Sequence, residues 1–105
     1  MTNKNSSFIE ELEKIIQKRS NSADIDKSYT QELLTSGKDR IAKKVIEESG
    51  ELAVAYLNDH EKKDEIVWEA ADLLYHMIVL LHSADVTIGY VSKEFEKRTK
   101  SDYSI

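Results

Sequence analysis

The chain has 105 residues and a net charge of −5, with 20 Asp and Glu against 15 Lys and Arg, and it contains no cysteine. This length fits one domain, residues 1–105 with a core at about 7–99, and leaves apolar surface for a second copy to cover. The absence of cysteine excludes disulfides, thiolate metal sites and cysteine nucleophiles, and the acidic charge argues against a nucleic-acid binder. The N-terminus has no apolar segment, and the longest apolar run, residues 77–81, is far shorter than the ~20 residues of a membrane span. We therefore expect a cytoplasmic protein with no membrane partner.

The chain has no proline and three glycines, which favours an all-helical fold. A possible capping box, Ser7 to Glu10, begins a first amphipathic helix at residues 7–19, and a polar loop follows at 20–27. A second box at residues 28–31 begins a short helix that Gly37 can close.

Three further segments complete the predicted fold. A third helix is expected at about 39–57, a turn at 58–62 and a fourth helix at about 64–84. A fifth helix ends near Thr99, and residues 100–105 are expected to fray. The sequence thus predicts an all-α bundle of four to five helices, built around an antiparallel hairpin and completed by oligomerisation, most simply as a homodimer.

Acidic side chains lie on the inward faces of the predicted hairpin. In the third helix, Glu48 falls within or beside the buried apolar stripe, and Glu51 falls on its edge with Lys44. In the fourth helix, which is apolar nearly all round from residue 73 to 81, Glu69 and Asp72 share one narrow sector. A buried carboxylate without a partner is costly, so each should be neutralised, pair with a cation or bind a metal.

The two acidic pairs also match in height along the hairpin. Glu51 and Glu69 are equally distant in sequence from the turn at His60, and so are Glu48 and Asp72. Four carboxylates should therefore converge, and such a set of hard oxygen ligands suits Mg²⁺ bound to phosphate. The alternative is a hairpin with solvated glutamates balanced by nearby lysines. A di-iron bundle is not indicated, because no E-x-x-H motif occurs on either helix.

The order E-x-x-E, spacer, E-x-x-D resembles the signature of the all-alpha nucleoside triphosphate pyrophosphatase superfamily. Within it, the chain resembles the phosphoribosyl-ATP pyrophosphatase family over about residues 9–98. The motifs that carry this resemblance are, in order, Ser28-Tyr29-Thr30, Leu33-Leu34, Gly37, Lys43 to Glu48, and Asp72 to His76.

This resemblance implies Mg²⁺-dependent hydrolysis of phosphoribosyl-ATP to phosphoribosyl-AMP and pyrophosphate, the second step of histidine biosynthesis. It maps the metal ligands onto Glu48, Glu51, Glu69 and Asp72. Beside Glu48 in the catalytic set, Glu47 is the candidate for binding a second metal or orienting the attacking water. Phosphoryl transfer needs charge neutralisation and alignment more than covalent help, which agrees with these roles.

The residues expected to bind the substrate are Ser28, Tyr29, Thr30, Lys44 and Arg98. The first three stand at a predicted helix N-terminus, which favours phosphate but equally fits a simple cap. Lys44 could meet a phosphate or pair with Glu48 or Glu51, and Arg98 could complement the dipole of the last helix. His76 could bond a ligand carboxylate, although a core histidine with satisfied hydrogen bonds is the favoured interpretation, and Trp68 and Tyr75 are assigned to core or dimer packing.

Two other functions stay open at this point. One is a house-cleaning pyrophosphatase acting on dUTP or a damaged nucleoside triphosphate, which would use the same carboxylates. The other is a non-enzymatic helical dimerisation module, in which the buried acids would be structural. The sequence leaves open the number of metal ions, the residue that activates water, and whether the pocket crosses a subunit interface.

Overall fold

The computed structural model of the chain describes residues 7–21, 28–58 and 62–100, and nearly all of them are helical. The five helices are α1 (Phe8–Ser20), α2 (Tyr29–Ser36), α3 (Lys38–Leu57), α4 (Lys63–Ser83) and α5 (Ile88–Lys100). No strand occurs in these three ranges, so the all-α prediction is confirmed. Most of the predicted loop at 20–27, the centre of the predicted turn at 58–62, and residues 101–105 lie outside the described residues. Lys100, expected to fray, is the last residue of α5.

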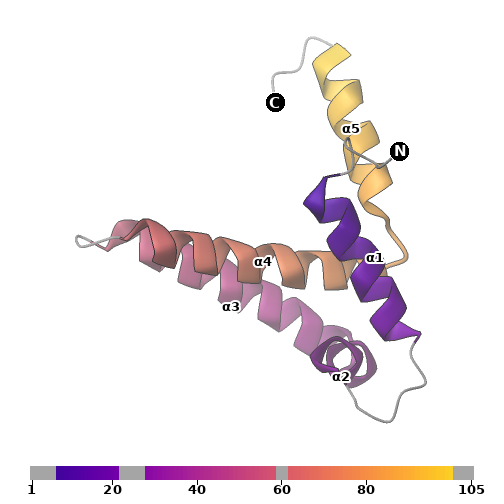
Figure 1. Cartoon of the computed structure of the whole chain (residues 1–105), viewed down its shortest axis with the longest axis horizontal. Helices are drawn as coiled ribbons and strands as arrows, with labels where there is room; N and C mark the ends of the chain where they lie inside the picture. The colour runs from indigo at the N-terminus through magenta and orange to yellow at the C-terminus, as the bar shows by residue number, and fades with distance from the viewer. Residues whose placement is uncertain (1–6, 22–27, 59–61, 101–105) are drawn as a thin grey trace.

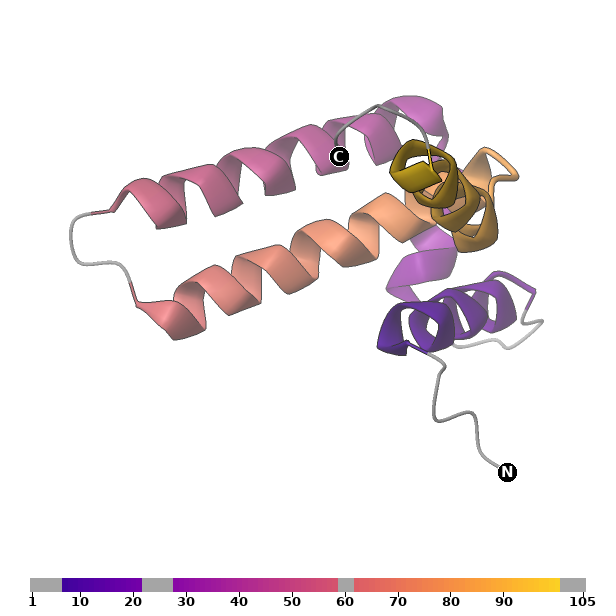
Figure 2. The ribbon, with the colours of Figure 1, turned by 90° about the horizontal axis from the view of Figure 1, so that it is seen from above.

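The helices α3 and α4 run antiparallel and form the long hairpin that the sequence predicts (Figures 1 and 2). The helices α1 and α2 gather at the end of the hairpin far from the turn, and α5 rises from that end away from the hairpin (Figure 1). The half of the hairpin next to the turn projects beyond the other helices (Figure 2).

Side-chain caps fix the starts of the first two helices. Ser7 Oγ accepts from the Glu10 amide at 3.1 Å, and Glu10 Oε1 accepts from the Ser7 amide at 3.3 Å, which completes the predicted capping box. Ser28 Oγ accepts from the Gln31 amide at 3.1 Å and caps α2. Gly37 joins α2 to α3 at φ 102°, a conformation that side chains with a Cβ rarely adopt.

The junction between α4 and α5 uses two features that helix periodicity does not predict. Asp85 adopts a left-handed conformation, φ 62°, and the amide of Val86 donates to the carbonyl of Leu81 at 2.9 Å, as in a Schellman motif. Glu13 Oε2 of α1 accepts from the amide of Ile88 at 2.7 Å. That bond supplies an acceptor to the first turn of α5 and joins α5 to α1.

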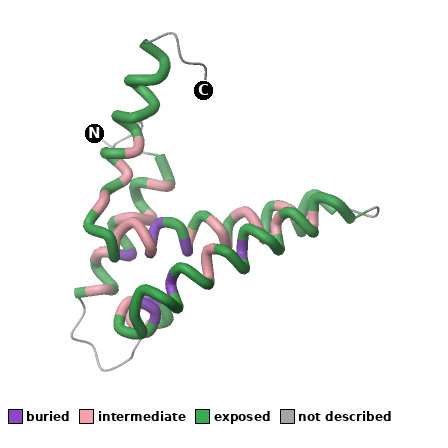
Figure 3. Tube along the Cα trace, turned by 180° about the vertical axis from the view of Figure 1, so that it is seen from behind, coloured by how far each residue is buried: buried purple, intermediate pink, exposed green. Residues whose placement is uncertain are grey.

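The core lies where α1 and α2 meet the base of the hairpin. Its buried apolar residues are Ile16 of α1, Leu33 of α2, Ile41 of α3, and Ile78 and Val79 of α4. Figure 3 shows the buried positions at this end and mostly exposed positions along the projecting half of the hairpin. No residue of α5 is buried.

The projecting half of the hairpin exposes large apolar side chains. Those exposed by 59% to 73% there are Val54, Tyr56, Leu57, Val67 and Trp68. The radius of gyration is 15.9 Å, whereas a compact domain of this length has about 13 Å. Among the described helices, only α4 is long and apolar enough to cross a membrane, with mean hydropathy 1.2. A helix that is buried by other protein can have the same length and hydropathy. A single copy therefore leaves uncovered an apolar surface of the kind that marks an interface.

Candidate metal and substrate site

The acidic residues predicted to converge across the hairpin do so in part. Carboxylate oxygens of Glu48 and Glu51 on α3 and of Glu69 on α4 all lie within 4.8 Å of one another. The i, i+3 spacing of Glu48 and Glu51 puts both on one face of α3. The antiparallel hairpin brings Glu69 of α4 to the same level along the helix axes. Glu48 is buried, at 5% exposed, as its helical phase predicts.

Two oxygens of this cluster are buried without a hydrogen-bond partner. They are Glu48 Oε1 and Glu69 Oε1. Burial of Glu69 raises the pKa of its carboxyl group, and the negative charges of Glu51, Asp72 and Glu48 raise it further. Buried acceptors that repel one another fit a hard divalent cation, because the ion supplies both the charge and the coordination that they lack.

The structure places the other two predicted acids at the margin of the cluster. Asp72 lies on α4 one turn beyond Glu69 and is half-buried, but its carboxylate lies outside the group of three. Glu47, with a side chain 44% exposed, borders a hollow of about 490 Å³ that Glu51 and Glu69 also line. This hollow opens beside the cluster and is also lined by Gly50, Val54 and Ala55.

Lys44 is the cation that touches this site. Its ammonium lies 3.2 Å from Glu48 Oε2 and 3.6 Å from Glu47 Oε1. The hydrogen bond to Glu48 raises the pKa of Lys44, and the nearby Tyr29, Glu48 and Glu47 add to that effect. Both interpretations of Lys44 therefore stay compatible with its position: it pairs with Glu48 and also faces the site.

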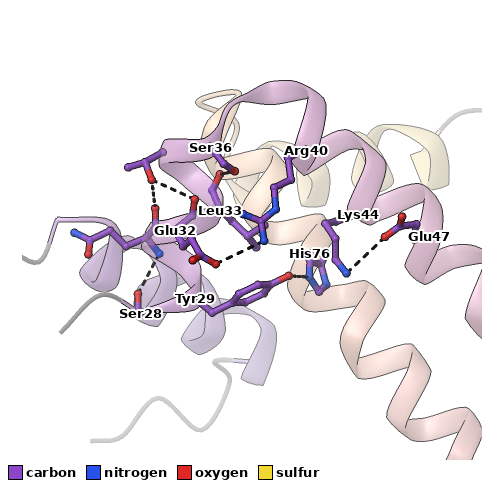
Figure 4. Close-up of polar contacts among 11 residues, drawn as sticks. Ser28, Tyr29, Glu32, Leu33, Ser36, Arg40, Lys44, Glu47 and His76 are labelled. Atoms are coloured by element: carbon purple, nitrogen blue, oxygen red, sulfur yellow. Dashed lines mark hydrogen bonds and ion pairs between the residues drawn. The ribbon is translucent and has the colours of Figure 1, made fainter.

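In the Ser28-Tyr29-Thr30 segment, the side chain of Tyr29 reaches α4 (Figure 4). The hydroxyl of Tyr29 points at His76 and lies 3.0 Å from its Nε2, while His76 Nδ1 lies 2.7 Å from the backbone carbonyl of Asp72. His76 is buried and bonded at both nitrogens, so the favoured interpretation of a satisfied core histidine is confirmed. It contacts the backbone of Asp72 and not its carboxylate.

The hydroxyls of Ser28 and Thr30 are engaged within the protein. Ser28 caps α2, and Thr30, which is 1% exposed, bonds the hydroxyl of Tyr75. Tyr75 packs against the core, as predicted, and desolvation raises the pKa of its phenol. In this segment, therefore, only the Tyr29 side chain, which is 43% exposed, combines a polar group with substantial exposure.

Arg98 lies apart from the acidic cluster. It sits near the end of α5, where its Nε donates to Glu94 Oε2 at 3.0 Å and its guanidinium lies 6.0 Å from the ring centre of Phe95. The helix α5 packs on α1 and rises away from the hairpin (Figure 1).

The helical hairpin and its cluster of three carboxylates, two of whose oxygens are buried without a hydrogen-bond partner, define an all-helical protein with a candidate cation site. Comparison with known proteins narrows this class. Residues 9–99 match the family model described as phosphoribosyl-ATP pyrophosphohydrolase. The chain belongs to this family of pyrophosphate-bond hydrolases, which confirms the resemblance drawn from its motifs.

Named relatives agree with the family. A phosphoribosyl-ATP pyrophosphatase of Pyrobaculum aerophilum is 46% identical over 93 residues, covering 89% of this chain and 96% of the relative. One of Leptospira biflexa is 42% identical over 91 residues, covering 87% and 96%. A histidine biosynthesis bifunctional protein HisIE of Pyrococcus furiosus is 42% identical over 94 residues, and this chain spans 42% of its length.

The link between Tyr29 and His76 is the part of the site that sequence analysis missed. Both residues stand inside motifs that it singled out, yet their contact depends on how α2 docks on α4. The two residues are 47 positions apart, and no periodic pattern relates such distant positions. The buried state of His76 was the available signal, since a buried imidazole needs partners for both nitrogens.

Proposed function

We propose that this chain hydrolyses phosphoribosyl-ATP between the α and β phosphates to give phosphoribosyl-AMP and pyrophosphate, the second step of histidine biosynthesis. The family and the printed names of the relatives support this substrate. The observation that carries the proposal is the cluster of Glu48, Glu51 and Glu69 with two buried, unpaired oxygens beside Lys44.

The metal in this proposal is Mg²⁺, held by Glu48, Glu51 and Glu69, with Asp72 as the fourth ligand. The donor set is all carboxylate, the kind of oxygen ligand that Mg²⁺ takes while keeping water and phosphate in its shell. When bound, the ion neutralises phosphate charge and lowers the pKa of a coordinated water.

The residues around the cluster then have separate tasks. Lys44 has three N–H groups and two carboxylate partners, which leaves one N–H for a phosphate oxygen. Glu47 borders the open hollow and is the carboxylate we assign to orienting or deprotonating the attacking water, or to a second metal. Glu48 acts in the catalytic set by anchoring both Lys44 and the metal.

The substrate contacts of the first motif follow from which of its groups are engaged. Because the hydroxyls of Ser28 and Thr30 bond within the protein, we assign their contribution to the backbone amides at the start of α2 and leave Tyr29 as the contacting side chain. Arg98 belongs to the proposed substrate contacts only if a second copy brings its α5 to this hairpin.

We also propose that the chain works as a cytoplasmic homodimer. The exposed apolar side chains of the projecting half of the hairpin support this proposal, because a second copy would bury them. Burial by a second copy would also explain why α4 is as apolar as a membrane-spanning helix.

The test is pyrophosphate release from phosphoribosyl-ATP, ATP and dUTP, each with Mg²⁺ and with excess chelator. Release from phosphoribosyl-ATP that the chelator abolishes is the expected result. Release chiefly from dUTP or ATP would assign the chain to a house-cleaning role, and no release from any of the three would leave a structural helical module.

A further inference from the structure

The buried imidazole of His76 connects two motifs that the proposed reaction uses. It is 6% exposed and lies between the Tyr29 hydroxyl, 3.0 Å from Nε2, and the carbonyl of Asp72, 2.7 Å from Nδ1. The metal ligands and the attacking water do not require this link. Its two partners nevertheless belong to the substrate segment at the start of α2 and to the acidic sector of α4.

The positions of the protons follow from what each partner can offer. A backbone carbonyl only accepts, so the hydrogen of the neutral ring must be on Nδ1. Nε2 then carries a lone pair and accepts, which makes Tyr29 the donor in their hydrogen bond. The only hydrogen of the phenol is thereby engaged by His76, and the oxygen of this 43% exposed side chain can still accept a hydrogen bond.

The surroundings hold this phenol in one orientation. The Tyr29 ring stacks on Tyr75, with centroids 6.0 Å apart and planes 23° apart, and meets the His76 ring edge-on at 5.7 Å. Tyr29 also lies close enough to Lys44 to raise the pKa of its ammonium. Figure 4 shows the Tyr29 hydroxyl directed at His76, with the Lys44 side chain in the same region of the site.

We propose that His76 is a positioning residue that fixes Tyr29 as a hydrogen-bond acceptor, so that Tyr29 recognises an O–H or N–H donor of the nucleotide and not a phosphate. A phosphate oxygen is itself an acceptor and gains nothing from a phenol whose hydrogen is already used. The donors of a phosphoribosylated nucleotide are its sugar hydroxyls and amino groups, so this contact reads the organic part of the substrate. The inference rests on the proposed function and deepens it.

The first test measures the tautomer and does not need activity. In ¹⁵N-histidine-labelled protein at a pH where the ring is neutral, the ring resonances of His76 should show a protonated Nδ1 and an unprotonated Nε2. Tyr29→Phe should shift the Nε2 resonance by removing its donor. A protonated Nε2 in the neutral ring would overturn the inference.

The second test is a double-mutant cycle on pyrophosphate release. Tyr29→Phe and His76→Leu should each raise KM roughly 5- to 10-fold, the range expected for one neutral hydrogen bond, with kcat within about twofold. The double variant should be no worse than Tyr29→Phe alone, because His76 acts through Tyr29. His76→Gln should recover most of the loss, since its amide oxygen can accept near the position of Nε2.

Matched measurements separate this idea from its alternatives. Tyr90→Phe removes a hydroxyl from a tyrosine on α5 that is 64% exposed and should leave KM unchanged. If the effects of the Tyr29 and His76 changes add, or if kcat falls in place of a rise in KM, His76 has a merely structural role and the inference fails. If the wild-type protein cleaves none of the three nucleotides, the proposed function fails first and this inference fails with it.

To identify the donor, the same KM ratios can be measured with substrate analogues that lack one sugar hydroxyl or the amino group. The analogue that lacks the recognised donor should bind wild type and Tyr29→Phe equally well. If every analogue keeps the full difference between the two proteins, Tyr29 does not accept from the substrate.

Discussion

At the scale of single residues, the candidate site contains carboxylate oxygens that are buried but have no hydrogen-bond donor when no ligand is bound. Glu48 Oε1 and Glu69 Oε1 are buried and find no hydrogen-bond donor among the residues that the structure describes. Such groups destabilise a folded chain unless a ligand repays their desolvation. Their presence on facing helices of one hairpin supports the proposed metal site.

Replacing Glu48 tests the central ligand. Glu48→Gln keeps the shape of the side chain but removes its charge, so it should lower kcat/KM at least about 100-fold and weaken Mg²⁺ binding. Steady-state kinetics and titration calorimetry measure the two effects. Glu65→Gln, an exposed glutamate in the first turn of α4, serves as the control and should keep normal values for both. Near-normal turnover of Glu48→Gln would disprove the ligand assignment.

The raised pKa of Glu69 predicts how stability depends on pH. The folded chain binds this proton more tightly than the unfolded chain, so without metal the free energy of unfolding falls as pH rises from the usual carboxyl range through the raised pKa. At neutral pH in chelator, Glu69→Gln should therefore melt at a higher temperature than wild type, and the difference should vanish at acidic pH.

Adding Mg²⁺ should reverse this order at neutral pH, because wild type gains stability by binding the ion and Glu69→Gln gains much less. Thermal unfolding followed by circular dichroism, with and without the metal, measures both orders. The same order of melting temperatures in both conditions would show that Glu69 does not hold the metal.

Helical phase and height were sufficient to predict where the carboxylates gather, because both are properties of two regular helices. The burial of Glu48 and its closeness to Glu51 and Glu69 follow from that geometry. Phase did not predict that Asp72 lies outside the group of three or that Thr30 turns inward to Tyr75. The contact between Thr30 and Tyr75 depends on how α2 packs against α4, which no local pattern in either segment encodes.

At the scale of elements, the connection between α2 and α3 depends on one backbone conformation. Gly37 has φ 102°, and replacing it with alanine should lower the free energy of unfolding by about 1–3 kcal/mol because a Cβ strains this conformation. Gly50 lies inside α3, where an added Cβ meets nothing within 4 Å. Gly50→Ala should therefore raise the free energy of unfolding by up to about 1 kcal/mol through helix propensity.

Urea denaturation of the two variants beside wild type measures both changes, and each glycine serves as the control for the other. Equal effects of the same sign would mean that the positive φ of Gly37 does not determine its role.

The helices themselves were largely predictable, since their apolar spacing, capping boxes and Gly37 are local signals. Their observed ends agree with the predicted ones within about two residues. The start of α5 was harder to predict from the sequence. Asp85 takes a left-handed conformation that is more usual for glycine, and the acceptor for the Ile88 amide comes from Glu13, 75 positions away.

At the scale of the whole molecule, the hairpin is longer than the core that supports it. The helices α1 and α2 cover one end of α3 and α4, and the projecting half is mostly exposed (Figure 3). That half carries the exposed apolar side chains, and the acidic cluster begins at Glu48 in the middle of α3. A second copy that covers these side chains would also exclude water from one side of the acidic cluster. Dimerisation and preorganisation of the site are therefore expected to be coupled.

Trp68 reports on this coupling, because it is the only tryptophan in the chain and is 69% exposed in a single copy. In the proposed dimer it should be protected from iodide quenching and emit at shorter wavelength than in an unfolded chain.

Val67→Arg places a charge beside Trp68 on the same exposed surface, so this variant should sediment as a monomer or unfold at concentrations where wild type is a dimer. Tyr90→Arg, on α5 and similarly exposed, is the control for adding a charge at an apolar surface position. If the wild-type protein sediments as a monomer and iodide quenches Trp68 fully, no second copy covers the apolar side chains of the hairpin. The proposed dimer would then be wrong.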